Sequence, residues 1–186
     1  MELTFAMAID VCIACVGNEL AGDDGVGMRM GRILQALPLP PGTQVRFYPQ
    51  VDLDLIDDLL AARRFVLCDA TRTGTAPGTV SILELEDITR FSRQPYCCHG
   101  IGLSELVLIA TELAPRGWHS DVHLVGVEVQ TVDEFGTQLS CAVQAALPDA
   151  LRHVLNLIGA SAELITLAEV EARNVAAPSL LLAFGG

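Results

Sequence analysis

The chain has 186 residues, half of them apolar and few of them aromatic, and it carries a formal net charge of −12. A chain of this length buries a core that needs neither disulfides nor a structural metal to fold. The negative charge argues against nucleic acid and anionic membrane surfaces as partners, and it favours a metal cation or a basic protein segment.

Strands and helices are predicted to alternate along the chain. Runs of apolar residues predict strands at 8–16, 43–48, 65–68, 79–85 and 122–129. Apolar residues at helical spacing predict helices at 26–37, 52–60, 101–113 and 139–158, and a helix is one option for 162–173. This alternation predicts an α/β fold, a three-layer α/β/α sandwich around a mostly parallel, mixed sheet with strand 79–85 at an edge.

The predicted domain organisation is one α/β domain over residues 1–160, followed by a C-terminal extension at 161–186 whose structure stays open. Pro148 falls inside the predicted helix 139–158 and is expected to kink or break it. No apolar run reaches the roughly 18 residues of a membrane span, and the N-terminus lacks the features of a signal peptide. We therefore expect no membrane partner and a cytoplasmic location.

The six cysteines do not form a recognisable metal-binding set. Cys12 and Cys15 form a C-x-x-C pair, but on a strand these side chains point to opposite faces. The remaining four are scattered over the chain: Cys68, Cys97, Cys98 and Cys141. No second C-x-x-C completes a zinc site, so we expect buried, reduced thiols.

A glycine-rich turn at 15–27 joins the first predicted strand to the first predicted helix, where α/β folds usually place ligands. A helix N-terminus favours an anion, but the turn carries Glu19, Asp23 and Asp24. These carboxylates would repel a phosphate and attract a cation. We take Asp24 as a candidate metal ligand, Asp23 as a helix cap and Glu19 as a solvated neighbour.

Two further polar residues are predicted at the same edge of the sheet. Asp69 ends the buried strand 65–68, and His99 precedes a predicted helix. Taken singly, Asp24 also fits a helix cap and His99 a satisfied polar group. Together, two carboxylates and one imidazole suit nickel, zinc, iron or manganese, or serve as acid–base groups in hydrolysis. The other histidines are expected in a loop, a strand and a helix surface: His119, His123 and His153.

Several ordered motifs resemble one known family. They are G-N-E-L-A-G-D-D-G-V-G at 17–27, F-V-L-C-D-A at 65–70, P-G-T at 77–79, H-G-I-G-L at 99–103 and L-V-G-V-E at 124–128. This set is similar to the endopeptidases that mature nickel–iron hydrogenases by trimming the C-terminal extension of the large subunit. The segment Y-P-Q-V-D at 48–52 departs from the Asp-Gly-Gly stretch of many relatives and resembles a glutamine-bearing variant.

The resemblance implies that Asp24, Asp69 and His99 bind a metal and carry the catalysis, as in an aspartyl-type endopeptidase. The implied partner is the hydrogenase large-subunit precursor, which supplies nickel as part of the substrate; zinc or cadmium would substitute for it. Whether the metal or the carboxylates perform the cleavage is left open. Residues expected in substrate-binding loops are Gly17, Asn18, Gly25 and Gln50.

Three other functions stay open on the sequence. The first is a non-catalytic, nickel-binding checkpoint or chaperone that docks on the same precursor without cutting it. The second is a nucleotide-binding domain, which the glycine turn alone suggests and its acidic residues oppose. The third is a general peptidase. The leading hypothesis is the hydrogenase maturation endopeptidase.

Overall fold

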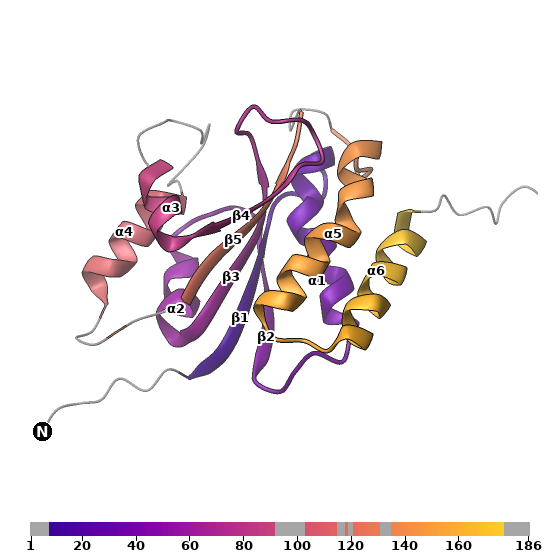
Figure 1. Cartoon of the computed structure of the whole chain (residues 1–186). Helices are drawn as coiled ribbons and strands as arrows, with labels where there is room; N and C mark the ends of the chain where they lie inside the picture. Colours follow the sequence, from indigo (N-terminus) through magenta and orange to yellow (C-terminus); the bar gives the residue numbers. More distant parts are fainter. Residues whose placement is uncertain (1–7, 92–102, 115–117, 119–120, 131–134, 177–186) are drawn as a thin grey trace, which may run out of the picture.

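The computed structural model describes residues 8–91, 103–114, 118, 121–130 and 135–176. These residues form a central sheet with helices on both faces (Figure 1). The predicted three-layer α/β/α architecture is confirmed. Among the described residues, no helix combines the length and the apolar character needed to cross a membrane.

The sheet has five strands in the order β2-β1-β3-β5-β4. Their bounds are Ile9–Val16 (β1), Thr43–Tyr48 (β2), Ala62–Thr71 (β3), Val80–Glu84 (β4) and Asp121–Glu128 (β5). All pairs are parallel except β4 with β5. The predicted position of β4 at an edge of the sheet is confirmed, and the structure adds that it runs antiparallel. The parallel strands therefore end along one edge of the sheet.

Six α-helices and one short 3-10 helix complete the described fold. One face is covered by α1 (Val26–Gln35), α5 (Cys141–Leu157) and α6 (Ala162–Ala176). The other is covered by α2 (Asp54–Ala61), α3 (Leu85–Phe91) and α4 (Leu103–Leu113). The 3-10 helix η1 (Gly22–Gly25) links the turn after β1 to α1.

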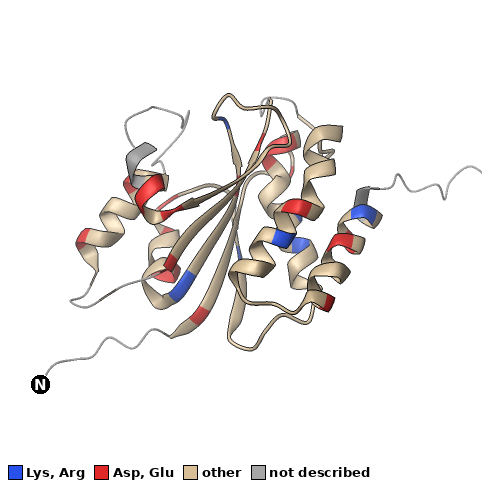
Figure 2. Cartoon of the chain, in the orientation of Figure 1, with Lys and Arg blue, Asp and Glu red and all other residues tan. Residues whose placement is uncertain are grey.

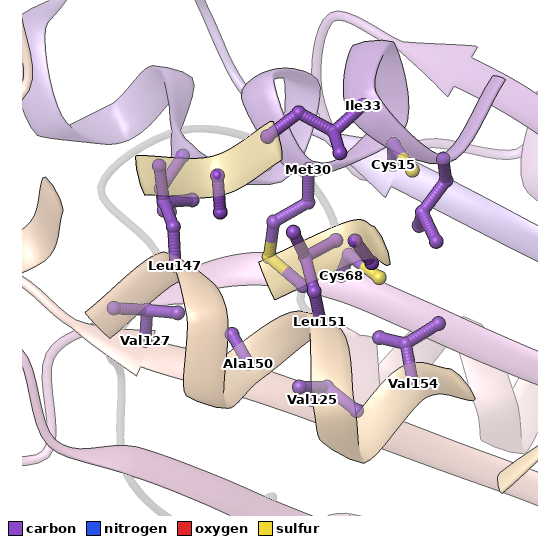
Figure 3. Packing of buried hydrophobic residues seen from close by; sticks show 14 of the residues in the cluster. Cys15, Met30, Ile33, Cys68, Val125, Val127, Leu147, Ala150, Leu151 and Val154 are labelled. Atoms are coloured by element: carbon purple, nitrogen blue, oxygen red, sulfur yellow. The ribbon is translucent and has the colours of Figure 1, made fainter. Parts of the chain in front are cut away.

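Each face of the sheet has its own hydrophobic core. Under α1 and α5, Met30, Leu147 and Leu151 are fully buried against Val125 of β5 (Figure 3). Side chains on the opposite face pack under α2 and α4. Each fully buried Leu or Phe contributes about 1.5–3 kcal/mol relative to exposure. Packing on two faces therefore holds the strand ends, and the loops that follow them, in fixed positions.

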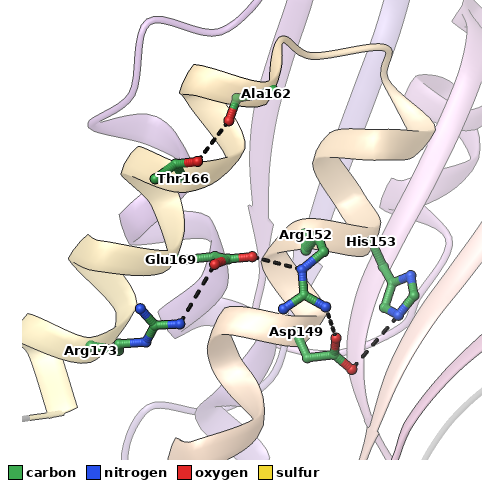
Figure 4. Close-up of polar contacts among 7 residues, drawn as sticks. All are labelled: Asp149, Arg152, His153, Ala162, Thr166, Glu169 and Arg173. Atoms are coloured by element: carbon green, nitrogen blue, oxygen red, sulfur yellow. Dashed lines mark hydrogen bonds and ion pairs between the residues drawn. The ribbon is translucent and has the colours of Figure 1, made fainter.

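Helix α6 belongs to the same layer as α5. Its apolar residues Leu164 and Ala168 are buried in the core beneath it. On the outer side, the Arg152 guanidinium on α5 donates to Glu169 Oε1 at 2.6 Å, and Arg173 also pairs with Glu169 (Figure 4). The prediction of a helix near 162–173 is confirmed, and residues 177–186 lie outside the described part. The boundary at residue 160 stays a prediction.

Some sequence predictions of local structure are wrong. The predicted break at Pro148 is wrong: α5 continues through it, with Leu147 and Leu151 of its inner face buried in the core, and a kink there stays a prediction. β3 is longer than predicted and includes Asp69. α3 is missing from the sequence predictions because it is short and carries adjacent acidic residues, although Ile88 is buried in the core.

The prediction of buried, reduced cysteines is confirmed for the cysteines on the strands and is wrong for Cys141 on α5. Cys12, Cys15 and Cys68 are buried free thiols, and Cys12 and Cys15 belong to the cores on opposite faces. Burial, together with the nearby Asp58 carboxylate, raises the pKa of the Cys12 thiol to about 12. Cys141 is exposed, because it begins α5 on the solvent side. Cys97 and Cys98 lie outside the described residues.

Candidate functional site

The turn after β1 is built around the carboxylate of Asp24. The Asn18 backbone N–H donates to Asp24 Oδ2 at 2.8 Å. The side chain of Asn18 in turn accepts from the Leu20 N–H at 3.0 Å and closes a local turn. Gly17 has a φ of +135°, and a side chain there would collide with the Asp24 carbonyl oxygen. The predicted loop residues Gly17 and Asn18 therefore fix the orientation of Asp24.

Gly27 brings this turn against the sheet. A β-carbon at this position would lie 2.3 Å from the carbonyl oxygens of both Val16 and Cys68. Val16 is the last residue of β1 and Cys68 lies near the end of β3, so only glycine lets α1 begin this close to both strands. The same approach places the turn that holds Asp24 next to the end of β3, where Asp69 lies.

Asp69 is the third residue from the end of β3 and pairs with Gly126 of β5. Because side chains alternate along a strand, it faces the α2 and α4 side, as Leu67 does. Its Oδ1 accepts from the Ala70 N–H at 2.8 Å. Burial and the negative charge of Asp24 outweigh this hydrogen bond and raise the pKa of Asp69 to about 7. The two predicted carboxylates therefore lie in one site.

The third predicted residue, His99, lies outside the described residues. Helix α4 begins at Leu103 on the face of the sheet to which Asp69 points. Within the described ranges, no three His, Cys, Asp or Glu side chains gather closely enough to hold a metal. The described site thus contains Asp24 and Asp69, and the assignment of His99 stays a prediction.

The other two acids of the turn have different roles. Asp23 is buried, and its Oδ1 accepts from the Ser140 N–H at 2.6 Å, next to the start of α5. It makes no capping bond to the helix that follows it, so the predicted role as its cap is wrong. The sequence does not indicate this hydrogen bond, because Ser140 is 117 positions away from Asp23. Glu19 lies at the surface and pairs with Arg32 at 3.2 Å.

The segment after β2 is joined to the same turn. The Gly17 N–H donates to the Tyr48 carbonyl at 3.2 Å, and the Tyr48 hydroxyl donates to Asp58 of α2. These bonds hold the start of the loop that carries the exposed Gln50. Tyr48 and Asp58 were not predicted as site residues, because their pairing depends on the packing of α2 beside β2.

Gly25 and two histidines also lie where the sequence places them. Gly25 is buried, and a β-carbon there would come within 3.1 Å of the Glu19 Cα, so it keeps the turn compact. His123 lies on β5 and its Nε2 contacts Asp121 Oδ1 at 2.7 Å. His153 lies on the outer side of α5 and pairs with Asp149 at 3.7 Å (Figure 4). His119 lies outside the described residues.

Glu128 organises the loop between β3 and β4. It ends β5 and is buried, and it accepts hydrogen bonds from the Thr73 N–H, the Gly74 N–H and the Thr71 hydroxyl. Burial would raise the pKa of Glu128, but these hydrogen bonds outweigh it and lower the pKa. A pocket of about 560 Å³ opens beside it, and Arg72 contributes the positive charge of its wall.

The charge of the site matches the charge of the whole chain. Acidic residues outnumber basic ones by 23 to 11, and Figure 2 shows them on both helical layers. Burial is the main cause of the raised pKa of Asp69, and the negative charge of Asp24 adds to it. A cation bound beside Asp24 and Asp69 would offset the negative charge of both carboxylates.

The raised pKa of Asp69 has a measurable effect on stability. An unfolded Asp loses its proton near 3.8, whereas Asp69 in the fold keeps it up to about 7. Because the folded state binds the extra proton between these values, its free energy of unfolding falls as the pH rises through this window. Asp69→Asn removes this loss and is expected to stabilise the fold by up to about 4 kcal/mol at pH above 7.

Urea unfolding of the two proteins at about pH 5 and about pH 8 measures this effect. The gain of the variant is expected to be less than half as large at the lower pH. An equal gain at both pH values would show that packing, rather than titration of Asp69, is responsible.

Comparisons with known proteins agree on one family. A family model described as HycI, hydrogenase maturation protease, matches residues 50–157. The hydrogenase expression/formation protein HoxM of Cupriavidus necator is 30% identical over 152 residues, which cover 77% of this chain and 71% of HoxM. The match to the family model spans more than half of the chain.

Solved structures show the same fold. The hydrogenase maturating endopeptidase HybD from E. coli superposes with a TM-score of 0.70 at 24% identity, covering 80% of this chain and 91% of HybD. A hydrogenase 2 maturation peptidase from a Thaumarchaeota archaeon superposes with a TM-score of 0.58 at 29% identity, covering 82% and 99%. These findings favour an endopeptidase over the non-catalytic and nucleotide-binding alternatives. The chain belongs to the hydrogenase maturation protease family.

Proposed function

We propose that this endopeptidase recognises nickel in a hydrogenase large-subunit precursor through Asp24 and Asp69, and then removes the C-terminal extension of the precursor. The observation that carries the proposal is that two carboxylates lie at the same edge of the sheet, each held by a backbone N–H. Burial raises the pKa of Asp69, and the charge of Asp24 adds to this effect. A cation bound between the two side chains stabilises both in their charged form. His99 is the third ligand in this proposal.

The arrangement supports recognition of a metal that arrives with the substrate. Asp24 Oδ2 is held by the Asn18 N–H and Asp69 Oδ1 by the Ala70 N–H. Within the described part of the chain, the second oxygen of each carboxylate has no hydrogen-bond partner. Two carboxylates and one imidazole leave coordination positions free for ligands from the precursor. Nickel, zinc or cadmium would fit this combination of oxygen and nitrogen ligands.

The same residues supply a proton acceptor for hydrolysis. Peptide hydrolysis adds water to the scissile carbonyl, and the proton that water loses must reach the departing amine. A carboxyl group that titrates near pH 7 accepts and returns a proton without a large energy barrier. Without a cation, Asp69 titrates near pH 7, and a bound cation would hold it in the charged form that accepts the proton of water. Nickel bound in the substrate would polarise the scissile carbonyl or the attacking water.

Processing is expected to depend on nickel in the substrate. The purified protein should shorten a nickel-loaded precursor, as intact mass spectrometry would show, and leave the nickel-free precursor unchanged. An unrelated unfolded protein serves as the control and should stay intact. Equal cleavage of both precursors would contradict nickel recognition. Binding without any loss of mass would instead support the non-catalytic checkpoint.

A further inference from the structure

We propose that Leu20 and Phe135 form an apolar docking patch that receives an apolar side chain of the precursor next to the cleaved bond. This inference rests on the proposed function, because it concerns the same substrate at the same edge of the sheet. The two residues come from different loops, one from the turn after β1 and one from the loop between β5 and α5. We call them the Leu20–Phe135 patch.

Leu20 and Phe135 are two of the eight large apolar side chains that are exposed in the described part of the chain. They belong to the turn that holds Asp24 and to the loop bonded to that turn. Phe135 is 89% exposed and Leu20 is 52% exposed. Scattered single apolar residues on a surface need no explanation, but neighbouring exposed ones beside a functional site often mark an interaction surface. An exposed aromatic ring is a common anchor in such surfaces, because its burial removes much apolar area from water.

Backbone hydrogen bonds hold the two residues beside each other. The Gly136 N–H donates to the Leu20 carbonyl at 2.9 Å, and the Gly22 N–H donates to the Gly136 carbonyl at 2.7 Å. These bonds form a parallel bridge between Ala21 and Gly136. Phe135 precedes Gly136 directly, so the bridge fixes its position relative to Leu20.

Two side-chain bonds strengthen the same link. Asp23 accepts from the Ser140 N–H at 2.6 Å, and Arg29 of α1 donates to the Thr137 carbonyl at 3.4 Å. Residues 136–140, before α5, are thus bonded to the turn and to α1 at several points. The Phe135 side chain nevertheless stays exposed. A surface that is rigid before binding loses less conformational entropy when a partner binds.

The position of the patch identifies its occupant. Leu20 lies in the turn that holds Asp24, and the local bond between Asn18 and the Leu20 N–H joins the two. A substrate bound at Asp24 therefore passes close to the Leu20–Phe135 patch. Its segment there should be apolar and carry no negative charge, because the turn is acidic.

The size of the patch favours a bound peptide over a second copy of this chain. An aromatic side chain buries about 150–250 Å², whereas a stable dimer interface buries about 800 Å² on each partner. Two side chains fall well below that area. They match the area that a single apolar side chain of a peptide would cover.

The test compares KM, kcat and the melting temperature of Phe135→Ala and Leu20→Ala with those of the wild type, which separates substrate binding from catalysis. Each variant keeps its backbone hydrogen bonds, so the melting temperature should not change. With nickel-loaded precursor, Phe135→Ala is expected to raise KM about tenfold or more with kcat unchanged. Phe135→Leu should recover most of the affinity. Leu113→Ala is the matched control, since Leu113 is 64% exposed at the far end of α4.

The outcomes distinguish this inference from the proposed function. Normal processing by Phe135→Ala, with an unchanged KM, would overturn the patch and leave the function intact. If the wild type does not cut the precursor, direct binding of the nickel-loaded precursor decides: weaker binding by Phe135→Ala supports the patch, and equal or absent binding overturns it. A wild-type dimer that Phe135→Ala dissociates would assign the patch to a second copy and overturn the proposal.

Discussion

Asp69→Asn is expected to lower processing of the nickel-loaded precursor by about 10²–10⁴-fold, the range typical of a lost acid–base group. Asparagine keeps the shape of the side chain and still accepts from the Ala70 N–H. It cannot take a proton from water, and it binds a cation more weakly than a carboxylate does. Asp24→Asn is expected to give a similar loss, because both carboxylates face the same metal in the proposed site.

The rate of appearance of the shortened precursor, followed by mass spectrometry, measures this loss. Glu19→Gln is the matched control, because it removes one negative charge from the same turn at a residue that pairs with Arg32 at the surface. It should retain activity within about twofold, the effect of a weak surface ion pair. If Glu19→Gln lost as much activity as Asp69→Asn, the total charge of the turn would matter rather than the two assigned ligands.

Gly27→Ala is expected to destabilise the fold by about 3 kcal/mol, within the range for overpacking. The added β-carbon would lie 2.3 Å from two backbone carbonyl oxygens, and backbone atoms cannot move aside as a flexible side chain can. For a chain of this size, the melting temperature should fall by about 6–12 °C. The displaced start of α1 would also carry Asp24 away from Asp69, so activity should drop even below the melting temperature.

Thermal unfolding of Gly27→Ala and of Gly136→Ala measures the effect. Gly136 is the control because a β-carbon there would meet no atom within 4 Å. Its variant should unfold within a few degrees of the wild type. A normal melting temperature for Gly27→Ala would mean that α1 can retreat from the strands at little cost.

Much of the fold follows from local patterns. The apolar run of β1, the helical spacing in α5 and the position of Asp69 near a strand end are local signals, and they place both described carboxylates at the correct edge. Pro148 shows the limit of this reasoning, since burial of the inner face of α5 overrides the local preference of proline. α3 shows it too, because a helix of seven residues is too short to display a clear apolar periodicity.

Parts of the site could not be predicted because they depend on contacts between distant segments. The Asp23 carboxylate resembles a local helix cap in the sequence, and only the fold brings the Ser140 N–H to it. The exposure of Phe135 follows from the path of a loop rather than from its neighbours in the sequence. The pairing of Tyr48 with Asp58 likewise requires α2 to pack beside β2.

The bond between Asp23 and Ser140 also bears on when this enzyme becomes active during its own synthesis. The two residues are 117 positions apart, and β3 pairs with β5, which follows it by a long stretch of chain. Contacts of such separation form only after the later segment has left the ribosome. A nascent chain that ends before Ser140 carries every motif but lacks the partner of Asp23. The turn that holds Asp24 therefore gains its last support only when most of the protein has been made.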